Sequence, residues 1–141
     1  MNVYFDSSSL AKRYIDENGS AEVDSILQET TQLAVSVIAV PEILSGLNRR
    51  IREGSITSAD YVEVKKHMAD DMKDMITIQL VPEVIATCIK LLEKNRLRAM
   101  DALHVACAVE WNAGLFVTSD KRQLSAARHA GLESNYIGPP N

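Results

Sequence analysis

The sequence contains few of the residues that cross-link small secreted proteins or bind zinc. It has only two cysteines, Cys88 and Cys107, and both lie in apolar stretches with helical spacing. They are typical of small core residues in a reducing compartment and argue against a disulfide framework. The three histidines are scattered, so no zinc-binding spacing occurs.

Long apolar runs are also missing, and no segment has the length that spanning a bilayer requires. Met1 leads directly into a β-prone segment, which predicts that no signal peptide is present. Together with reduced cysteines, these features predict a cytoplasmic protein that has no membrane partner.

Positive charge is in short supply. The net charge is −4, which argues against a generic nucleic-acid binder, because such proteins are usually basic. It does not exclude an enzyme that cuts nucleic acid, because divalent cations bridge protein carboxylates and substrate phosphates. The chain is 46% apolar and 24% charged over 141 residues, a composition and length that predict one globular domain, 1–141.

Short β-prone runs alternate with helical patterns along the whole chain. The predicted strands are 3–5, 33–37, 76–80 and 115–118, with 135–137 as a short edge strand. Helical spacing begins at Leu10 after the first strand, and residues 102–109 are apolar or small on nearly every helical face. Strands alternating with helices predict an α/β fold in which a parallel sheet of four to five strands carries helices on both faces.

Acidic residues recur where these elements end or begin. Asp6 and Asp120 follow the first and fourth strands, while Glu42 and Asp101 lie near helix starts. Open α/β sheets bind ligands at the carboxyl edge of their strands, so we expect all four acids at that edge. Helix capping by Asp6 is an alternative for the first acid, and a favourable helix-dipole contact is one for Glu42.

A cluster of four carboxylates is costly without a cation. Two charges ~8 Å apart repel by roughly 2 kcal/mol at an effective dielectric constant of ~20. Six such pairs approach about 12 kcal/mol, comparable with the ~5–15 kcal/mol stability of a whole domain. Oxygen ligands select Mg²⁺ or Mn²⁺ over zinc, and such an ion activates water for hydrolysis. His104, one turn after Asp101, is interpreted as a hydrogen-bonded packing histidine and not as a ligand.

The ordered motifs resemble those of PIN-domain nucleases, and most closely the VapC-type toxins of toxin–antitoxin pairs. The segments that carry the resemblance are residues 4–12, 41–44, 98–104 and 116–120, with Asp101-Ala102-Leu103-His104 the sharpest. The resemblance covers essentially the whole chain. It implies a PIN-like three-layer α/β/α fold and an Mg²⁺- or Mn²⁺-dependent endoribonuclease that hydrolyses phosphodiester bonds with metal-activated water.

By motif position, the resemblance implies that Asp6, Glu42, Asp101 and Asp120 are the catalytic acids. Asp6 and Asp101 are expected as direct metal ligands, and Glu42 and Asp120 as acids that act through water. Supporting roles toward the metal shell or the phosphate fall to Ser8, Thr118 and Ser119. Some family members carry a further acid after the last motif, whereas Lys121, Arg122 and Gln123 stand here, which leaves the number of metal ions open.

The resemblance also implies partners: an RNA substrate, a VapB-like antitoxin that blocks the acidic pocket with a basic side chain, and a second copy in a homodimer. Cations beside the motifs are candidates for gripping the RNA backbone, or are ordinary solvated charges. They are Lys12, Arg13, Arg49, Arg50, Arg98, Lys121 and Arg122. The alternatives are a PIN nuclease of RNA processing without an antitoxin and a non-catalytic PIN-like scaffold.

A phospho-acceptor receiver domain is another doubly wound class with acids and Mg²⁺. That class needs an acid pair after the first strand and an acceptor aspartate after the third. Here Asp6 stands alone, and the third strand runs into Leu80-Val81-Pro82. The sequence therefore argues against a receiver domain.

Overall fold

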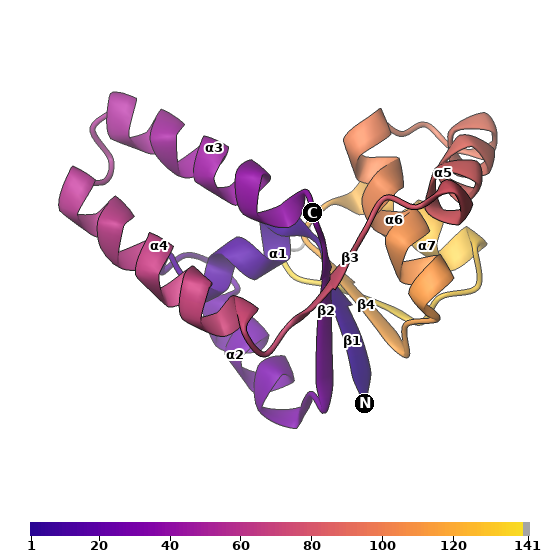
Figure 1. Ribbon diagram of the computed structural model, residues 1–141, viewed down its shortest axis with the longest axis horizontal. Helices are drawn as coiled ribbons and strands as arrows, with labels where there is room; N and C mark the ends of the chain where they lie inside the picture. Colours follow the sequence, from indigo (N-terminus) through magenta and orange to yellow (C-terminus); the bar gives the residue numbers. More distant parts are fainter. Residues whose placement is uncertain (140–141) are drawn as a thin grey trace.

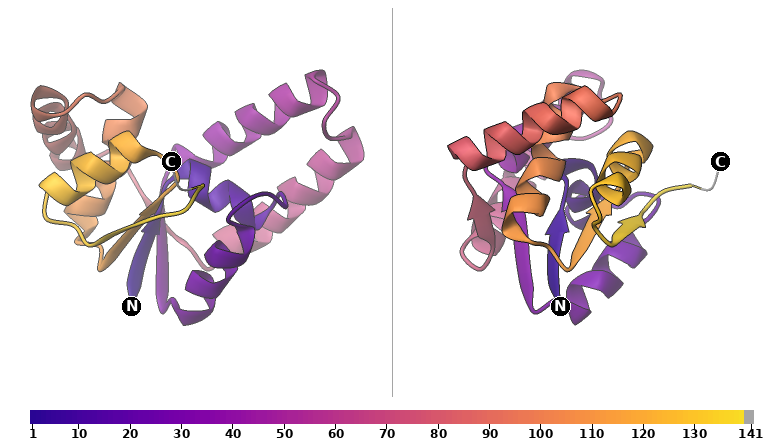
Figure 2. Two further views of the ribbon diagram at one scale, coloured as in Figure 1. Left: turned by 180° about the vertical axis from the view of Figure 1, so that it is seen from behind. Right: turned by 90° about the vertical axis from the view of Figure 1, so that its right-hand side faces the viewer.

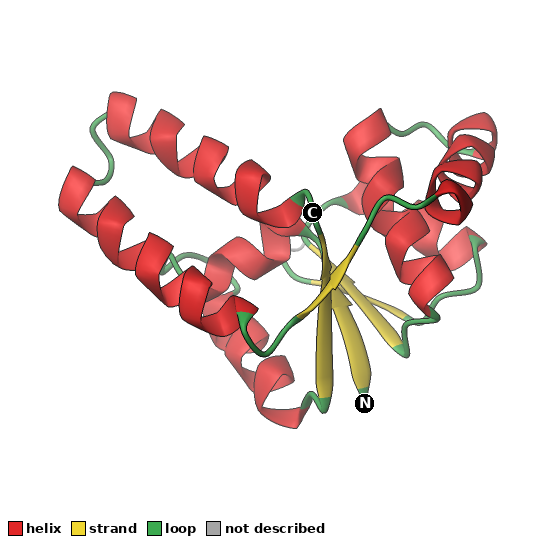
Figure 3. Ribbon diagram, in the orientation of Figure 1, coloured by secondary structure: helices red, strands yellow, loops and turns green. Residues whose placement is uncertain are grey.

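A five-stranded parallel sheet forms the centre of the computed structural model, which describes residues 1–139 (Figures 1 and 3). The strands are β1 (Asn2–Phe5), β2 (Gln32–Ser36), β3 (Ile76–Ile78), β4 (Leu115–Thr118) and β5 (Ser134–Tyr136). Their order is β3-β2-β1-β4-β5, and every neighbouring pair is parallel. The predicted parallel sheet, including its short strand near the carboxyl end of the chain, is confirmed.

Helices cover both faces of this sheet, so the predicted three-layer α/β/α architecture is also confirmed (Figures 1 and 2). The first layer contains α1 (Ser7–Leu10), a 3-10 turn η1 (Ala11–Arg13), α2 (Ser20–Glu29), α3 (Ala39–Arg52) and α4 (Ser58–Met72). The second layer contains α5 (Pro82–Lys94), α6 (Ala99–Trp111) and α7 (Lys121–His129). The helices α3 and α4 form an antiparallel pair that extends beyond the sheet (Figure 1).

Alternation along the strands divides the core into two halves. Tyr4 and Phe116 face α5, α6 and α7, and their rings stack with centroids 5.6 Å apart. Val3, Phe5 and Val117 face the opposite layer. All five side chains are fully buried, as expected for strands covered on both sides. The two cysteines are free and buried, as the sequence predicts.

Two predicted elements differ in extent by more than one residue. The first helix begins at Ser7 and not at Leu10, because Asp6 caps its amino end. Beyond Leu10 it continues as the 3-10 turn η1. The third strand ends at Ile78 and not at residue 80. Pro82 opens α5, and the residue before a proline is held in an extended conformation that prepares the turn into the helix.

The topology places a ligand-binding edge at a defined point. From β1 the chain moves to β2 and β3 on one side, whereas β4 and β5 lie on the other side. The reversal falls between β1 and β4, and open α/β sheets bind ligands at the carboxyl ends of the strands at such a point. The backbone N–H of Asp6 donates to the carbonyl oxygen of Val117 at 3.1 Å, which joins the two strand ends.

Two glycines with a positive φ differ in whether a side chain would meet the core, and one of them contacts Ile137. Gly19 precedes α2 with φ +97°, and a Cβ placed there would lie 2.6 Å from Cγ2 of buried Ile137. Gly54 also has a positive φ of +77°, but a Cβ there would meet nothing within 4 Å.

We therefore expect Gly54→Ala to lower the free energy of unfolding by about 1 kcal/mol through backbone strain alone. Gly19→Ala should cost roughly 1–3 kcal/mol more, because the new methyl group also clashes in the core. Urea unfolding followed by circular dichroism measures both values. Equal losses in the two variants would contradict the described packing of Ile137.

Candidate active site

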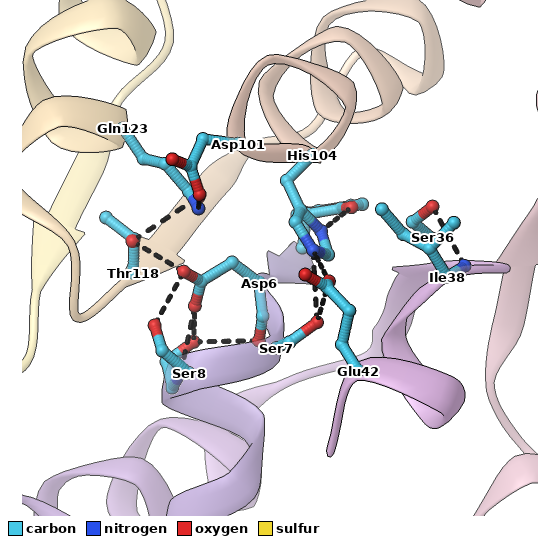
Figure 4. Close-up of polar contacts among 12 residues, drawn as sticks. Asp6, Ser7, Ser8, Ser36, Ile38, Glu42, Asp101, His104, Thr118 and Gln123 are labelled. Atoms are coloured by element: carbon cyan, nitrogen blue, oxygen red, sulfur yellow. Dashed lines mark hydrogen bonds and ion pairs between the residues drawn. The ribbon is translucent and has the colours of Figure 1, made fainter. Parts of the chain in front are cut away.

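Asp6 occupies the carboxyl end of β1 and is 1% exposed. Its Oδ1 accepts hydrogen bonds from the backbone N–H of Ser9 at 2.9 Å and the Ser9 hydroxyl at 2.6 Å. Its Oδ2 accepts from the hydroxyls of Ser8 at 2.7 Å and Thr118 at 2.8 Å (Figure 4). The carboxylate therefore caps α1 and also ties that helix to β4.

Glu42, in the first turn of α3, is held by a separate set of donors. Its Oε1 lies 2.6 Å from the Ser7 hydroxyl and 2.6 Å from Nε2 of His104. His104 is 1% exposed, and its Nδ1 lies 2.8 Å from the Tyr4 hydroxyl. The prediction that His104 is a buried, hydrogen-bonded histidine is confirmed, but its partner Glu42 is not predictable from sequence.

Burial and these contacts determine the protonation states of the Glu42 carboxyl group and the Tyr4 phenol. Burial raises the pKa of Glu42, but hydrogen bonds from His104 and Ser7 outweigh burial, so the pKa lies below its usual 4.5. Burial raises the pKa of the Tyr4 phenol well above 10. Glu42 is therefore ionised near neutral pH, whereas Tyr4 keeps its proton.

Asp101 lies in the first turn of α6, with its side chain 14% exposed. Its Oδ1 accepts a hydrogen bond from the side-chain amide of Gln123 at 3.1 Å. Its Oδ2 is buried and has no hydrogen-bond partner among the described residues, although the Arg98 Nε lies 3.6 Å away. A buried carboxylate oxygen without a donor is costly, so it marks a position where a ligand can be accommodated.

Asp120 follows β4 and caps α7. Its Oδ1 accepts from the backbone N–H groups of Arg122 at 2.8 Å and Gln123 at 3.1 Å. The backbone N–H of Asp120 in turn donates to the Thr118 hydroxyl at 2.9 Å, which connects it with the partners of Asp6. Ser119 lies beside them, and its backbone N–H is 3.4 Å from the Ser8 hydroxyl oxygen.

The four acids line one cleft of about 630 Å³. They do not form a tight cluster, because the described residues include no group of three acidic, histidine or cysteine side chains placed to hold one metal ion. The four acids thus share one cleft, as expected for the carboxyl edge of the sheet, without forming a group that could hold one metal ion. Hydrogen bonds hold the acids apart: Glu42 is bound to His104, and Asp120 to the amino end of α7.

The donor set nevertheless suits a hard divalent cation. Every acid contributes oxygen, the ligand type that Mg²⁺ and Mn²⁺ prefer. Asp6 is rigidly held, and the buried Oδ2 of Asp101 has lone pairs that no described residue uses. Asp6 and Asp101 therefore fit a role as metal ligands.

The predicted cations are distributed unevenly around the cleft. Those that line it are Lys12, Arg49, Arg50 and Arg98. Lys121 and Arg122 border an adjoining cavity together with Arg98 and Asp120. Arg13 is not brought to the cleft, because its guanidinium binds Asp71 at 2.7 and 3.2 Å on the side of α4.

Several residues that shape the site have no predicted role: Tyr4, Ser7, Ser9 and Gln123. The serine run after Asp6 is the only visible signal for two of them. The Ser7 hydroxyl donates to Glu42, whereas the Ser9 hydroxyl donates to Asp6. The sequence of a short serine run does not indicate which acid each serine binds. Gln123 binds Asp101 from the first turn of α7.

An open parallel sheet with acids in a cleft at its topological switch point belongs to the doubly wound α/β class. The sequence model of the PIN domain matches residues 3–129, so the chain belongs to the PIN domain family. A comparison with curated proteins gave no match. None of the helices within residues 1–139 combines the length and apolar character needed to cross a membrane.

Several solved structures have a similar fold. A toxin–antitoxin complex from Klebsiella pneumoniae is 15% identical, with a TM-score of 0.67 over 87% of this chain and 90% of that one. FitAcB from Neisseria gonorrhoeae is 12% identical, with a TM-score of 0.69 over 94% and 95%. VapC20 from Mycobacterium tuberculosis, a sarcin-ricin loop cleaving toxin, is 12% identical, with a TM-score of 0.68 over 88% and 94%.

The lowered pKa of Glu42 has a consequence for stability. A carboxyl group whose pKa is lower in the folded protein than in the unfolded chain stabilises the fold above the unfolded value. That contribution disappears as the pH falls through the folded pKa, here below about 4.5.

We therefore expect the unfolding free energy of the wild type to fall more steeply than that of Glu42→Gln between about pH 5 and pH 3. Urea unfolding at a series of pH values tests this. Parallel curves over the acid range would show that Glu42 is not held as described.

Proposed function

We propose that this protein is an Mg²⁺- or Mn²⁺-dependent endoribonuclease that acts as the toxin of a toxin–antitoxin pair. The observation that carries the proposal is the cleft at the switch point, where Asp6, Glu42, Asp101 and Asp120 meet and where Oδ2 of Asp101 is buried without a donor. Membership of the PIN domain family supports the same chemistry.

In this proposal Asp6 and Asp101 hold the metal ion, while Glu42 and Asp120 act through water. The bound ion supplies an acidified, oriented water and charge stabilisation at the phosphate. The protein's own contribution is preorganisation: hydroxyls of Ser8 and Thr118 fix Oδ2 of Asp6. Ser119, which also lines the cleft, is the third candidate for orienting the phosphate.

RNA is the proposed substrate because two further cavities adjoin the cleft, one bordered by Arg49 and the other by Arg98, Lys121 and Arg122. One shares Glu42, Gly46 and Arg49 with the cleft, and the other shares Arg98, Ser119 and Asp120. An extended strand laid along this path would pass the acids in the middle and meet arginines on both sides. Cations so placed bind phosphates and position the strand without reading its sequence. Cleavage of the sarcin-ricin loop by VapC20, whose fold is similar, agrees with this substrate.

The proposed partners are an antitoxin and a second copy of the chain. Several structures with a similar fold are toxin–antitoxin complexes, among them the complex from Klebsiella pneumoniae. A negatively charged cleft of this size can accept a basic side chain from such an antitoxin, which would exclude the metal and the substrate together. The cytoplasm is the proposed compartment, because reduced, buried Cys88 and Cys107 suit it.

Neutralising the two proposed metal ligands tests the reaction. Asp6→Asn and Asp101→Asn should each lower cleavage of single-stranded RNA by at least about 100-fold in Mg²⁺ or Mn²⁺, because each removes a charged ligand. Both variants should also weaken binding of Mn²⁺, measured by calorimetry. Asp70→Asn is the matched control, because Asp70 is 77% exposed on α4 and does not line the cleft. Wild-type rates in both site variants would refute the proposal.

The basic rim can be tested through one arginine. Arg49 is exposed, borders the cleft and its neighbouring groove, and lies on α3. Arg49→Ala should raise the KM for RNA several-fold with little change in kcat, and should reduce the salt dependence of binding by about 0.7 if Arg49 neutralises one phosphate. Arg52→Ala serves as the control, because Arg52 is exposed on the same helix but does not line the cleft. Identical salt slopes for the two variants would place the RNA elsewhere.

A further inference from the structure

We propose that His104 is a positioning residue: backed by Tyr4, it holds Glu42 in one orientation at the edge of the cleft. This inference rests on the proposed function, in which Glu42 takes part in cleavage. In this role His104 does more than fill the core, and Tyr4 fixes the orientation of the His104 ring.

The geometry around His104 uses both ring nitrogens. Nδ1 is 2.8 Å from the Tyr4 hydroxyl, and Nε2 is 2.6 Å from Oε1 of Glu42 and 3.0 Å from the Ser7 hydroxyl (Figure 4). Tyr4 is itself fixed, because its ring is fully buried and stacks on Phe116. Rotating the imidazole by half a turn would break both nitrogen contacts, so the core specifies a single ring orientation.

The proton positions follow from what each group can do. The ionised carboxylate of Glu42 can only accept a hydrogen bond, so Nε2 of His104 must carry a proton. In the neutral ring Nδ1 is then an acceptor, and the Tyr4 hydroxyl donates to it. The direction of donation therefore runs from Tyr4 through His104 to Glu42.

The contacts leave one oxygen of Glu42 for the cleft. Both the Ser7 hydroxyl and Nε2 of His104 contact Oε1. Oε2 is the remaining oxygen of a side chain that lines the cleft. A glutamate has three side-chain torsions, and anchoring one oxygen in advance removes most of the freedom that binding would otherwise have to remove.

The arrangement also separates Glu42 from Asp6. Adjacent serines of α1 serve different acids, since Ser7 contacts Glu42 and Ser8 contacts Asp6. A histidine needed only for packing requires no carboxylate partner. Here the buried ring reaches from a core tyrosine to an acid on the cleft wall, which points to a positioning task.

The test combines conservative and disruptive variants of His104. His104→Gln can place an amide N–H near the position of Nε2, whereas His104→Asn is too short to reach Glu42. We expect His104→Asn to lower kcat by at least about 10-fold with KM changed by less than about 2-fold, and His104→Gln to restore kcat to within about 3-fold of wild type. The probe is a fluorophore–quencher oligoribonucleotide pool of random sequence, cleaved in Mg²⁺.

A double-mutant cycle with Glu42→Ala separates positioning from packing. If His104 acts through Glu42, adding His104→Asn to Glu42→Ala should change kcat by less than about 2-fold. Additive losses, or no rescue by His104→Gln in a protein that unfolds at the wild-type temperature, would overturn the inference. Tyr4→Phe is a second variant that keeps the ring packing, and it should lower kcat several-fold if the phenol fixes the histidine.

A readout without activity separates this inference from the proposed function. Nitrogen-15 NMR of the imidazole should show the Nε2–H tautomer of His104 in the wild type and a changed pattern in Glu42→Ala. An inactive wild-type protein with this signature would refute the nuclease but leave the Tyr4–His104–Glu42 geometry standing. An active protein with an Nδ1–H tautomer would refute the positioning of Glu42 by His104.

Discussion

The site depends on the hydrogen bonding of one carboxylate at the end of the first strand. Asp6 ends β1, caps α1 and accepts the hydroxyl of Thr118 from β4. A buried aspartate side chain is tolerable only when donors surround it, and here four donors do so. The strand end, the helix start and the neighbouring strand are thereby fixed relative to one another before any ligand binds.

The other acids are arranged around that fixed point by independent donors. Glu42 is held by Ser7 and His104, Asp101 by Gln123, and Asp120 by the amino end of α7. Because each acid has its own hydrogen-bond donors, the four acids line one cleft without forming a tight cluster. The repulsion that a four-carboxylate cluster would impose is reduced, because distance and hydrogen bonding take the place of a counter-ion.

The parallel sheet and the acids at its edge are readable from sequence, because both depend on local patterns. Alternating strands and helices predict the parallel sheet, and Asp6 and Asp120 stand directly after buried strands. The partners of these acids are less accessible. His104 and Glu42 are 62 residues apart, and only the tertiary fold brings them together.

It is equally hard to predict from sequence which acidic group a basic side chain will bind. Arg13 follows the first motif as closely as Lys12 does, yet it turns toward Asp71, while Lys12 stays on the cleft. The sequence locates the carboxylates but not the donors that hold each one, so it does not reveal that each acid of the cleft has its own hydrogen-bond partners. Local propensity is also insufficient at α1, where Asp6 starts a helix earlier than the apolar spacing indicates.

The position of β4 in the sheet has a consequence for the stage of translation at which the cleft can form. β4 lies between β1 and β5, and the backbone N–H of Ile137 donates to the carbonyl of Thr118 at 2.8 Å. Synthesis runs from the amino end, so Asp6, Glu42 and Asp101 emerge before the strand that brings Thr118 and Asp120. A nascent chain arrested before residue 115 therefore lacks part of the cleft. An enzyme that attacks RNA would thus remain inactive toward the transcript that encodes it until β4 has been synthesised.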